Sequence, residues 1–213
     1  MPGILYHLSF AEMVYRKLAT VISFSKNLFM AGNLIPDLSV DKWHSHYRKE
    51  ASFEGFFVPE MEIAKKELLD VSDSIKFGMY CHLYLDYHFI EDFLIPEFIW
   101  DVQNMLVTNP KNNKQWDTKT FFSASGMYGA YTEMSNLMIR NGHISMKVIE
   151  RIPEILPNTG MPVFDNRREK TWKEELNDYL AQEKDYTGEI FDHNQLWECI
   201  KMIADKLAEE ISQ

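Results

Sequence analysis

A polar pair inside an apolar segment is the feature that most constrains this chain. Residues 77–89 read FGMYCHLYLDYHF, which is aromatic, apolar and almost free of charge, yet His82 and Asp86 stand in its middle. At about 100° per residue, Asp86 lies only about 40° around a helix from His82. Both side chains therefore share one helix face, and that face is the most apolar one of the segment.

This pair has two interpretations. His82 and Asp86 could be a core pair that hydrogen-bonds to each other or to neighbours, or they could bind one metal ion with both side chains. A lone ionised carboxylate in a core costs several kcal/mol unless it is paired. Gly78, one turn before His82, leaves room for another backbone or a ligand. The choice depends on what the rest of the chain supplies.

The spacing of apolar residues predicts helices through most of the chain. The first is expected to start near Ser9, and the helix that carries the pair is expected from Ser72 or Ser74 to about Leu94, where Pro96 ends or kinks it. Further helices are predicted in EMEIAKKELLDV, IPEFIWDVQNMLV, GMYGAYTEMSNLMIR, SMKVIERIPEIL, KTWKEELNDYLAQE and NQLWECIKMIADKLAEEIS.

Loops are predicted between these helices. MAGNLIPDLS breaks the helical pattern at Gly32 and Pro36, and VDKWHSHYRKEASFEGFF continues as a loop. TNPKNNKQWD is expected to be a polar loop, and PNTGMPVFDNRR a loop that could lie near the mouth of a site. No strand run with hairpin turns stands out. With 213 residues, the chain suits a single all-α domain that covers residues 1–213.

Charge and cysteine content limit the class of partner and compartment. The net charge of -10 disfavours general nucleic-acid binding, because phosphate backbones need a basic surface. Cys81 and Cys199 form no disulfide framework or CxxC motif, which favours a reducing compartment. No signal peptide is read at the start, and no apolar run approaches the ~18 residues of a membrane span. We therefore expect a cytoplasmic protein without a transmembrane segment.

Histidines gather in the first half of the chain. His7 precedes the first expected helix, HSHYR contains His44 and His46, and Asp37 ends the run GNLIPD. Together with the pair on the later helix, these side chains could converge from three segments. Neutral imidazoles and carboxylate oxygens are ligands that zinc takes in proteins. The residues therefore favour a zinc site over a simple core pair.

Four short motifs occur in order within residues 1–90: MPGILYH, GNLIPD, HSHYR and FGMYCHLYLDYHF. Together they resemble the zinc-dependent phospholipase C-like family. Its members begin Met-Pro with a histidine near the seventh position, then carry a Pro-Asp loop, a Ser-His-aromatic element and a Gly-x-x-x-His-x-x-x-Asp helix. The rest of the chain matches only in being helical. The resemblance implies an all-α bundle of the phospholipase C and fungal single-strand nuclease type, with up to three metal ions between helices.

The resemblance also implies the site residues. Asp37 would be a ligand or the general base beside the metal-bound water. His44 fits less well than His46, because the family places its histidine between serine and an aromatic residue, as in Ser45-His46-Tyr47. The full set of implied ligands is His7, Asp37, His46, His82 and Asp86.

The chain departs from the family pattern downstream. Secreted phospholipases of this type also use a processed N-terminal amine, a further histidine and a later His-x-x-x-Glu pair. The one His-x-x-x-Glu here, His46 to Glu50, comes before the His82 helix, and a second His-x-x-x-Asp, His88 to Asp92, lies on the flank of that helix. We therefore expect one to three Zn2+ ions, or another divalent metal. Whether His44, Glu50, His88 or Asp92 joins the site stays open.

The implied activity is hydrolysis of a phosphoester by a metal-activated water, with Asp37 as the catalytic residue. The substrate would be a small phosphoester or a phospholipid head group, and Arg48 could contact its phosphate or form a surface salt bridge. The alternative is a non-catalytic or degenerate helical metal-binding protein. Phosphohydrolases with adjacent His-Asp ligands are disfavoured because no His-Asp dipeptide occurs, and ferritin-like di-iron proteins because no Glu-x-x-His occurs.

Overall fold

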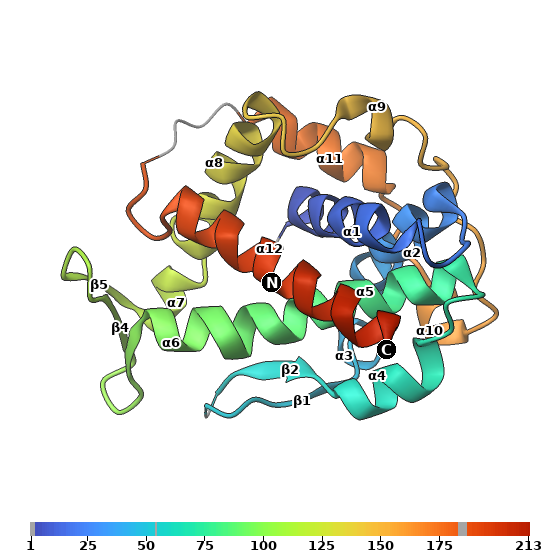
Figure 1. Cartoon of the computed structure of the whole chain (residues 1–213). Coiled ribbons are helices and arrows are strands. Elements are labelled where there is room, and N and C mark those ends of the chain that lie inside the picture. The colour runs from blue at the N-terminus through green and yellow to red at the C-terminus, as the bar shows by residue number, and fades with distance from the viewer. Residues whose placement is uncertain (1–2, 54, 183–186) are drawn as a thin grey trace.

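A computed structural model describes residues 3–53, 55–182 and 187–213, so the Met1-Pro2 start of the first motif lies outside it. Helices dominate this part of the chain (Figure 1). The longer helices are α1 (Ile4–Leu18), α2 (Lys26–Leu38), α4 (Met61–Leu68), α5 (Ser74–His88), α8 (Met127–Arg140), α11 (Trp172–Ala181) and α12 (His193–Ser212). The shorter ones are α3 (Lys42–Ser45), α6 (Ile95–Glu97), α7 (Thr118–Phe121), α9 (Met146–Ile149) and α10 (Pro162–Asp165).

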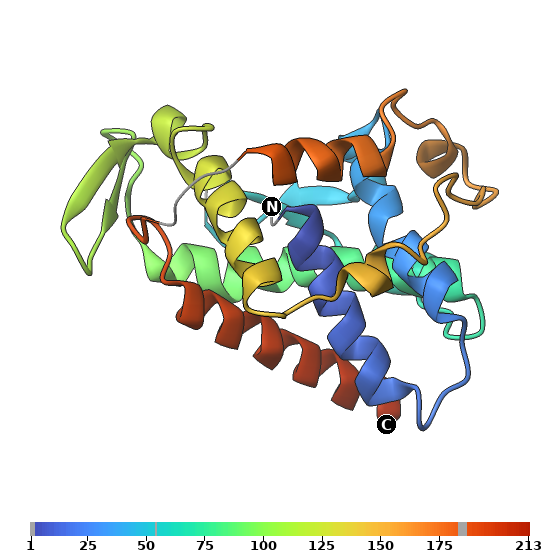
Figure 2. The ribbon, with the colours of Figure 1, turned by 90° about the horizontal axis from the view of Figure 1, so that it is seen from above.

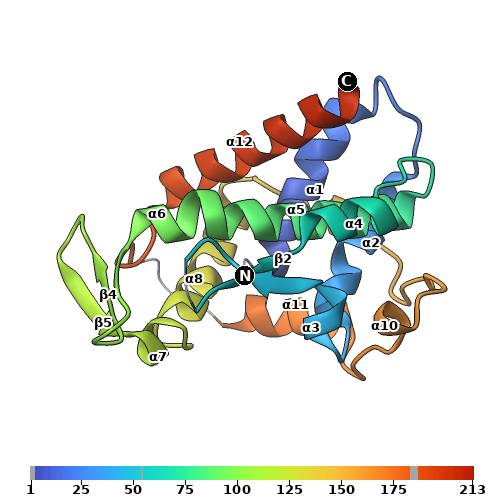
Figure 3. The ribbon, with the colours of Figure 1, turned by 90° about the horizontal axis from the view of Figure 1, so that it is seen from below.

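Helix α5 is the centre of the molecule, and α1, α2, α4 and α12 all pack against it (Figures 1 and 3). It begins at Ser74, one of the two predicted starts, because the Asp73 side chain accepts hydrogen bonds from the backbone N–H groups of Ile75 and Lys76. After His88 the chain continues as a π-helical segment, η1 (Phe89–Leu94), to the predicted end of the helix.

Two glycines allow α2 and α5 to cross at very short range. A Cβ atom at Gly78 would lie 2.1 Å from the carbonyl oxygen of Phe29, and one at Gly32 would lie 2.1 Å from the carbonyl oxygen of Ile75. Any side chain at either position would push the two backbones apart. The space that Gly78 leaves is therefore filled by the backbone of α2, which brings the Asp37 end of α2 beside His82.

Helix α12 packs along α1 and α5, whereas α8 and α11 pack against each other on the other side of α1 (Figure 2). Buried aromatic and aliphatic side chains from all these helices form the core, among them Phe10, Phe29, Phe77, Phe89 and Trp172. None of the helices in the described ranges is long and apolar enough to cross a membrane.

The prediction of an all-α fold is wrong. Strands β1 (Arg48–Glu50) and β2 (Phe57–Pro59) pair antiparallel, and a second antiparallel sheet has the order β3 (Ile99–Asp101), β4 (Leu106–Asn109), β5 (Lys114–Asp117). Each strand has only three or four residues. Alternation over so few positions cannot be told from helical spacing, because apolar residues in short runs fit both periods.

Two predicted segments are corrected by this second sheet. IPEFIWDVQNMLV was expected to be helical but contains β3 and the start of β4. The expected loop TNPKNNKQWD forms the β4–β5 hairpin, in which Val107 pairs with Trp116 and both side chains are buried. Asn113 in its turn has a positive φ of 57°, a conformation that asparagine tolerates better than most residues.

The segments that carry two candidate ligands also differ from their predictions. Helix α1 begins at Ile4 and not near Ser9, so His7 lies within the helix. GNLIPD is the last part of α2 and not a loop, although Pro36 lies inside that helix. Proline removes one backbone donor, which is why the segment looks like a helix break in the sequence. Asp37 is therefore held on a helix.

Candidate metal centre

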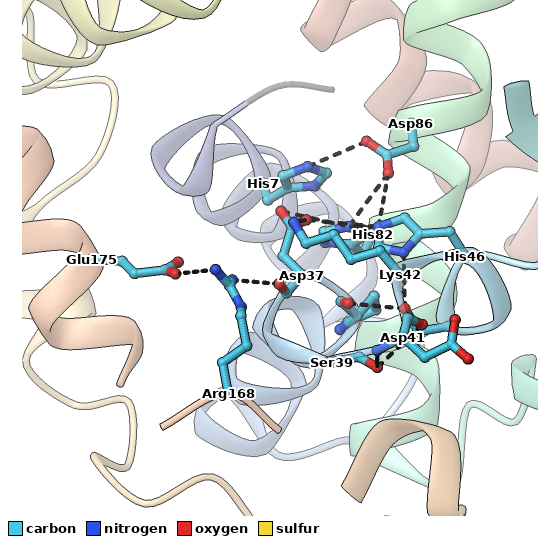
Figure 4. A network of polar contacts seen from close by, with 12 residues as sticks. His7, Asp37, Ser39, Asp41, Lys42, His46, His82, Asp86, Arg168 and Glu175 are labelled. Carbon is cyan, nitrogen blue, oxygen red and sulfur yellow. Dashed lines mark hydrogen bonds and ion pairs between the residues drawn. The ribbon is translucent and has the colours of Figure 1, made fainter. Parts of the chain in front are cut away.

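The five predicted site residues meet where α1, α2 and α5 come together (Figure 4). His7 comes from α1, Asp37 from the last turn of α2 and His46 from the residue after α3, while α5 supplies the other two. Four of the five side chains are at most 1% exposed; the Asp37 side chain is 26% exposed. His7, in the first turns of α1, therefore lies against the candidate residues of α5, as we expected for a ligand.

Hydrogen bonds orient two imidazole rings of the cluster. Nδ1 of His82 lies 2.8 Å from the backbone carbonyl oxygen of Asn33, which can only accept, so this nitrogen carries a hydrogen. The Ser45 hydroxyl donates its single hydrogen to the carbonyl of Pro36 at 3.1 Å, so it accepts from Nδ1 of His46 at 3.0 Å. Both Nε2 atoms are thereby turned toward the centre of the cluster.

Three donor atoms lie at the spacing of metal ligands. His82 Nε2 is 3.4 Å from His46 Nε2 and 3.4 Å from Asp86 Oδ2, and His46 Nε2 is 3.6 Å from the same Asp86 oxygen. Ligand atoms at about 2.0–2.1 Å from a tetrahedral zinc ion are about 3.3–3.4 Å apart. The three atoms therefore match three corners of one tetrahedron.

The same distances argue against a simple hydrogen-bonded core pair. A charge-assisted hydrogen bond between an imidazolium and a carboxylate is about 2.7–2.9 Å long. None of the contacts of His82, His46 or His7 with Asp86 is that short; all lie between 3.4 and 3.6 Å. At these distances, both carboxylate oxygens of Asp86 lack a hydrogen-bond partner among the described residues. A bound cation would satisfy them.

Asp37 lies at the open side of this set. Its Oδ1 is 3.7 Å from His46 Nε2 and its Oδ2 is 4.0 Å from His82 Nε2. Lys42 Nζ lies 2.8 Å from Oδ1. Burial opposes the charge on Asp37, but Lys42 and the nearby histidines outweigh it and lower the pKa of this carboxyl. The residue is therefore an ionised carboxylate at a possible fourth ligand position.

His7 faces the second oxygen of the same carboxylate. Its Nε2 is 3.4 Å from Asp86 Oδ1, and its ring stacks on that of His82 with centroids 3.7 Å apart and planes 7° apart. Both ring nitrogens of His7 are buried and have no hydrogen-bond partner within the described ranges. Asp86 thus presents one oxygen to His46 and His82 and the other to His7. His7 also belongs to a second group of possible ligands, which it forms with Asp37 and His82.

Burial and charge set the protonation states of these groups, and they favour metal binding at His7, His46 and Asp86 but oppose it at His82, whose raised pKa favours the protonated ring. Burial lowers the pKa of His46 to about 3 and, with the charge of His82, lowers the pKa of His7. Burial opposes charge on His82 and on Asp86 too, but their mutual attraction raises the pKa of His82 and holds that of Asp86 well below its usual range. Neutral imidazoles and ionised carboxylates are the forms that bind zinc.

A cleft of about 520 Å³ opens onto the cluster, with His7, Asp37 and His82 on its wall. Four basic side chains also line it: Lys42, Arg48, Arg168 and Lys170. Arg168 belongs to PNTGMPVFDNRR, so this segment reaches the cleft that opens onto the candidate residues. The Arg168 guanidinium donates to the backbone carbonyl of Asp37 at 2.6 Å and lies 2.7 Å from Glu175 (Figure 4).

The residues left open by the sequence do not enter the cluster. His44 has a 72% exposed side chain and bonds to Asp41 at 2.6 Å. Glu50 is exposed on β1. His88 bonds to Asp92 at 2.6 Å, on the side of the helix that faces α12. The cluster is therefore built from the five residues that the motifs indicated.

Three residues that support the cluster were missed in the sequence. Asn33 acts through its backbone carbonyl, which leaves no signal in a sequence. Ser45 was noted only as part of a motif, although its hydroxyl orients His46. Lys42 was not singled out, because its contact with Asp37 depends on the turn between α2 and α3.

Comparison with known proteins identifies no relative of this chain. No family model, no curated protein and no solved structure matches it. The geometry of the cluster and the resemblance of its motifs are therefore the grounds on which a function can be proposed.

Proposed function

We propose that this protein is a metal-dependent hydrolase of phosphoesters, with zinc held by the buried cluster. The single observation that carries the proposal is the spacing of His46 Nε2, His82 Nε2 and Asp86 Oδ2. These atoms lie 3.4–3.6 Å apart, at the distances of tetrahedral ligands and beyond those of direct charged hydrogen bonds. We also propose membership in the zinc-dependent phospholipase C-like family, on the strength of the four ordered motifs.

The residues of the cluster divide into those that hold the metal and those that face the substrate. His46, His82 and Asp86 would hold one ion, and His7 would be a further ligand beside them. A zinc ion held there would supply Lewis acidity and activate a water molecule for attack. Asn33 and Ser45 fix the two imidazole rings, which reduces the freedom that would be lost when a metal binds.

Asp37 is the residue best placed to act on the attacking water. It lies between the ligands and the cleft, and it stays ionised because of Lys42. A carboxylate with a lowered pKa stays ionised and accepts hydrogen bonds, but it is a weak base and does not keep a proton. We therefore assign Asp37 to orienting the water and receiving its hydrogen bond, with Lys42 keeping the carboxylate in place.

The cleft favours an anionic substrate of small size. The whole chain has a net charge of -10, yet this cleft is lined by four basic side chains against three acidic ones, Asp37, Glu175 and Asp178, so that Arg48 is the cation in excess. Basic groups near a metal offset the charge of phosphoryl oxygens. The substrate class that we propose is therefore a small phosphoester or a phospholipid head group. No helix among the described residues could span a membrane. A cytoplasmic location is proposed from the two buried, unpaired cysteines, Cys81 and Cys199.

Burial of the cluster favours one alternative, a metal-binding protein without catalysis. His46 and Asp86 are 0% exposed, as ligands of a purely structural ion would be. Zinc content and turnover separate the two functions. The protein should be stripped with a chelator, reloaded with zinc and assayed on 4-nitrophenyl phosphate and on bis(4-nitrophenyl) phosphate.

We expect at least one equivalent of zinc and hydrolysis that disappears on stripping and returns on reloading. Zinc uptake without hydrolysis of either ester would support the structural alternative. A stripped protein that takes up less than a tenth of an equivalent would reject both.

A further inference from the structure

Arg48 differs from the other basic side chains of the cleft. It is half-buried, and within the described ranges its guanidinium forms no ion pair and no hydrogen bond. The surface salt bridge considered for it is therefore not formed there. The other three cations are each paired: Lys42 with Asp37, Arg168 with Glu175 and Lys170 with Asp178.

The backbone of Arg48 is held firmly next to the candidate centre. It follows His46 by two residues, so their Cα atoms are within about 7 Å of each other. Tyr47 between them has a positive φ of 43°, a conformation that residues other than glycine seldom adopt. Its hydroxyl donates to Glu67 at 2.8 Å, and β1 pairs with β2 at Arg48 and Pro59.

We infer that Arg48 binds the phosphoryl group of the substrate and makes the cleft selective for phosphate monoesters. This inference rests on the proposed function. A guanidinium presents its donors as a planar fork and binds two oxygens of one phosphate at once. Both oxygens that Arg48 binds must be phosphoryl oxygens that neither contact the metal nor form the ester bond.

Counting oxygens separates the two substrate classes. A phosphate monoester has three non-ester oxygens, so two remain for Arg48 when one faces the metal. A diester has two, so only one remains and the bidentate contact is lost. In the reaction, water attacks phosphorus, the P–O bond to the alcohol breaks and the alcohol oxygen takes a proton. The products are the alcohol and inorganic phosphate, and Arg48 can bind this product as well.

The test combines phosphate binding with turnover of two esters. Inorganic phosphate is titrated into the metal-free and the zinc-loaded protein by calorimetry, for wild type, Arg48→Ala and Arg48→Lys. Lys49→Ala is the matched control: it removes a cation from the next residue of β1, which is exposed, pairs with Glu60 and does not line the cleft. Zinc content and thermal unfolding check that each variant keeps its fold.

We expect Arg48→Ala to bind phosphate about 10-fold to 100-fold more weakly, because a hydrogen bond to a charged group contributes about 1.5–3 kcal/mol. Wild type should prefer 4-nitrophenyl phosphate, and the substitution should lower kcat/KM for this monoester by a similar factor but for the diester by less than about threefold. Arg48→Lys should recover only part of the loss, and Lys49→Ala should stay within about twofold of wild type.

Equal phosphate binding in wild type and Arg48→Ala would overturn the inference, as would a wild-type preference for the diester. Failure of the proposed function gives a different result: no zinc uptake and no hydrolysis, with phosphate binding to the metal-free protein still dependent on Arg48.

Discussion

The same helical run carries two His-x-x-x-Asp pairs, and they have different structures. His82 and Asp86 are almost fully buried and stay 3.4 Å apart, with neither oxygen of Asp86 hydrogen-bonded within the described residues. His88 and Asp92 are hydrogen-bonded at 2.6 Å, and Asp92 has a 42% exposed side chain. One pair is left open for a further partner, and the other is complete.

The difference comes from what surrounds each pair. Nδ1 of His82 is taken by the carbonyl of Asn33 on α2, so this ring can offer only Nε2 to Asp86. Nδ1 of His88 bonds Asp92 directly, with Lys206 of α12 at 3.7 Å from that carboxylate. The spacing of a motif therefore does not decide its role, and the partner helix does.

The largest effect should follow from removing each histidine in turn. His82→Ala should weaken zinc binding more than about 100-fold, because loss of a direct ligand exceeds the 10–100-fold cost of losing a supporting contact. His88→Ala should keep the full zinc content and affinity. Competition titration with a chromophoric chelator measures both. Equal losses in the two variants would show that the pairs do not differ as the structure indicates.

Replacing the aspartates tests turnover in place of binding. Asp37→Asn should fold normally but lose about 100-fold in kcat, because misplacing a reacting group by about 1 Å can cost about 10²-fold. Asp92→Asn, the control from the complete pair, should leave kcat unchanged. Initial rates on both nitrophenyl esters at saturating zinc provide the measurement. An Asp37→Asn protein as active as wild type would remove this residue from the catalytic site.

In the metal-free protein, acid should lower the free energy of unfolding more through His46 of the candidate metal centre than through His88 of the His88–Asp92 pair. Burial lowers the pKa of His46 from 6.5 to about 3. Below pH 6.5 the unfolded chain takes up a proton that the folded protein refuses until about pH 3, so this contribution is full above pH 6.5 and lost as the pH falls. The free energy of unfolding should drop by about 1–2 kcal/mol through this group between pH 7 and pH 5.

Glutamine substitutions isolate that contribution. His46→Gln should flatten the pH dependence of unfolding by urea between pH 5 and pH 7. His88→Gln should flatten it less: burial lowers the pKa of His88 too, but its hydrogen bond to Asp92 acts in the opposite direction. His82 has the opposite effect in this window, since its raised pKa adds stability as the pH falls from 7 toward 5, but both variants keep this histidine, so the comparison between them stands. A larger flattening in His88→Gln would reverse the comparison.

The smallest effect is expected for the ion pair that Lys206 forms with Asp92. Lys206 and Asp92 have side chains that are 50% and 42% exposed, and their charged atoms are 3.7 Å apart. Exposed ion pairs contribute about 0–1 kcal/mol. Lys206→Met should therefore change the free energy of unfolding by less than about 1 kcal/mol in a urea titration. A loss of several kcal/mol would mean that this cluster is a structural core element.

The cluster could be predicted because its signal is local and chemical. A histidine and an aspartate on the apolar face of a helix need partners, and the ordered motifs supplied His7, Asp37 and His46. The contacts that orient those side chains could not be predicted in the same way. The carbonyl of Asn33 meets His82 only because two glycines let α2 and α5 approach closely, which is a property of the packed pair of helices.

The fold was predicted in most of its longer helices, but α2 and both sheets were missed. Helix α5 was expected from Ser72 or Ser74 because its start signal and its apolar spacing agree. Strands β1 to β5 are too short for alternation to show, and the β4–β5 turn lies in a polar run that reads as a loop. Pro36 led to a different error: a loop was expected where α2 continues, since a proline near the end of a helix looks like the helix boundary.

Anomalous scattering at the zinc edge, from a crystal of the zinc-loaded protein, tests the central claim most directly. A peak is predicted at about 2.0–2.1 Å from Nε2 of His46 and of His82 and about 2.0–2.2 Å from Oδ2 of Asp86. Absence of a peak there, or zinc bound instead by His88 and Asp92, would contradict the account.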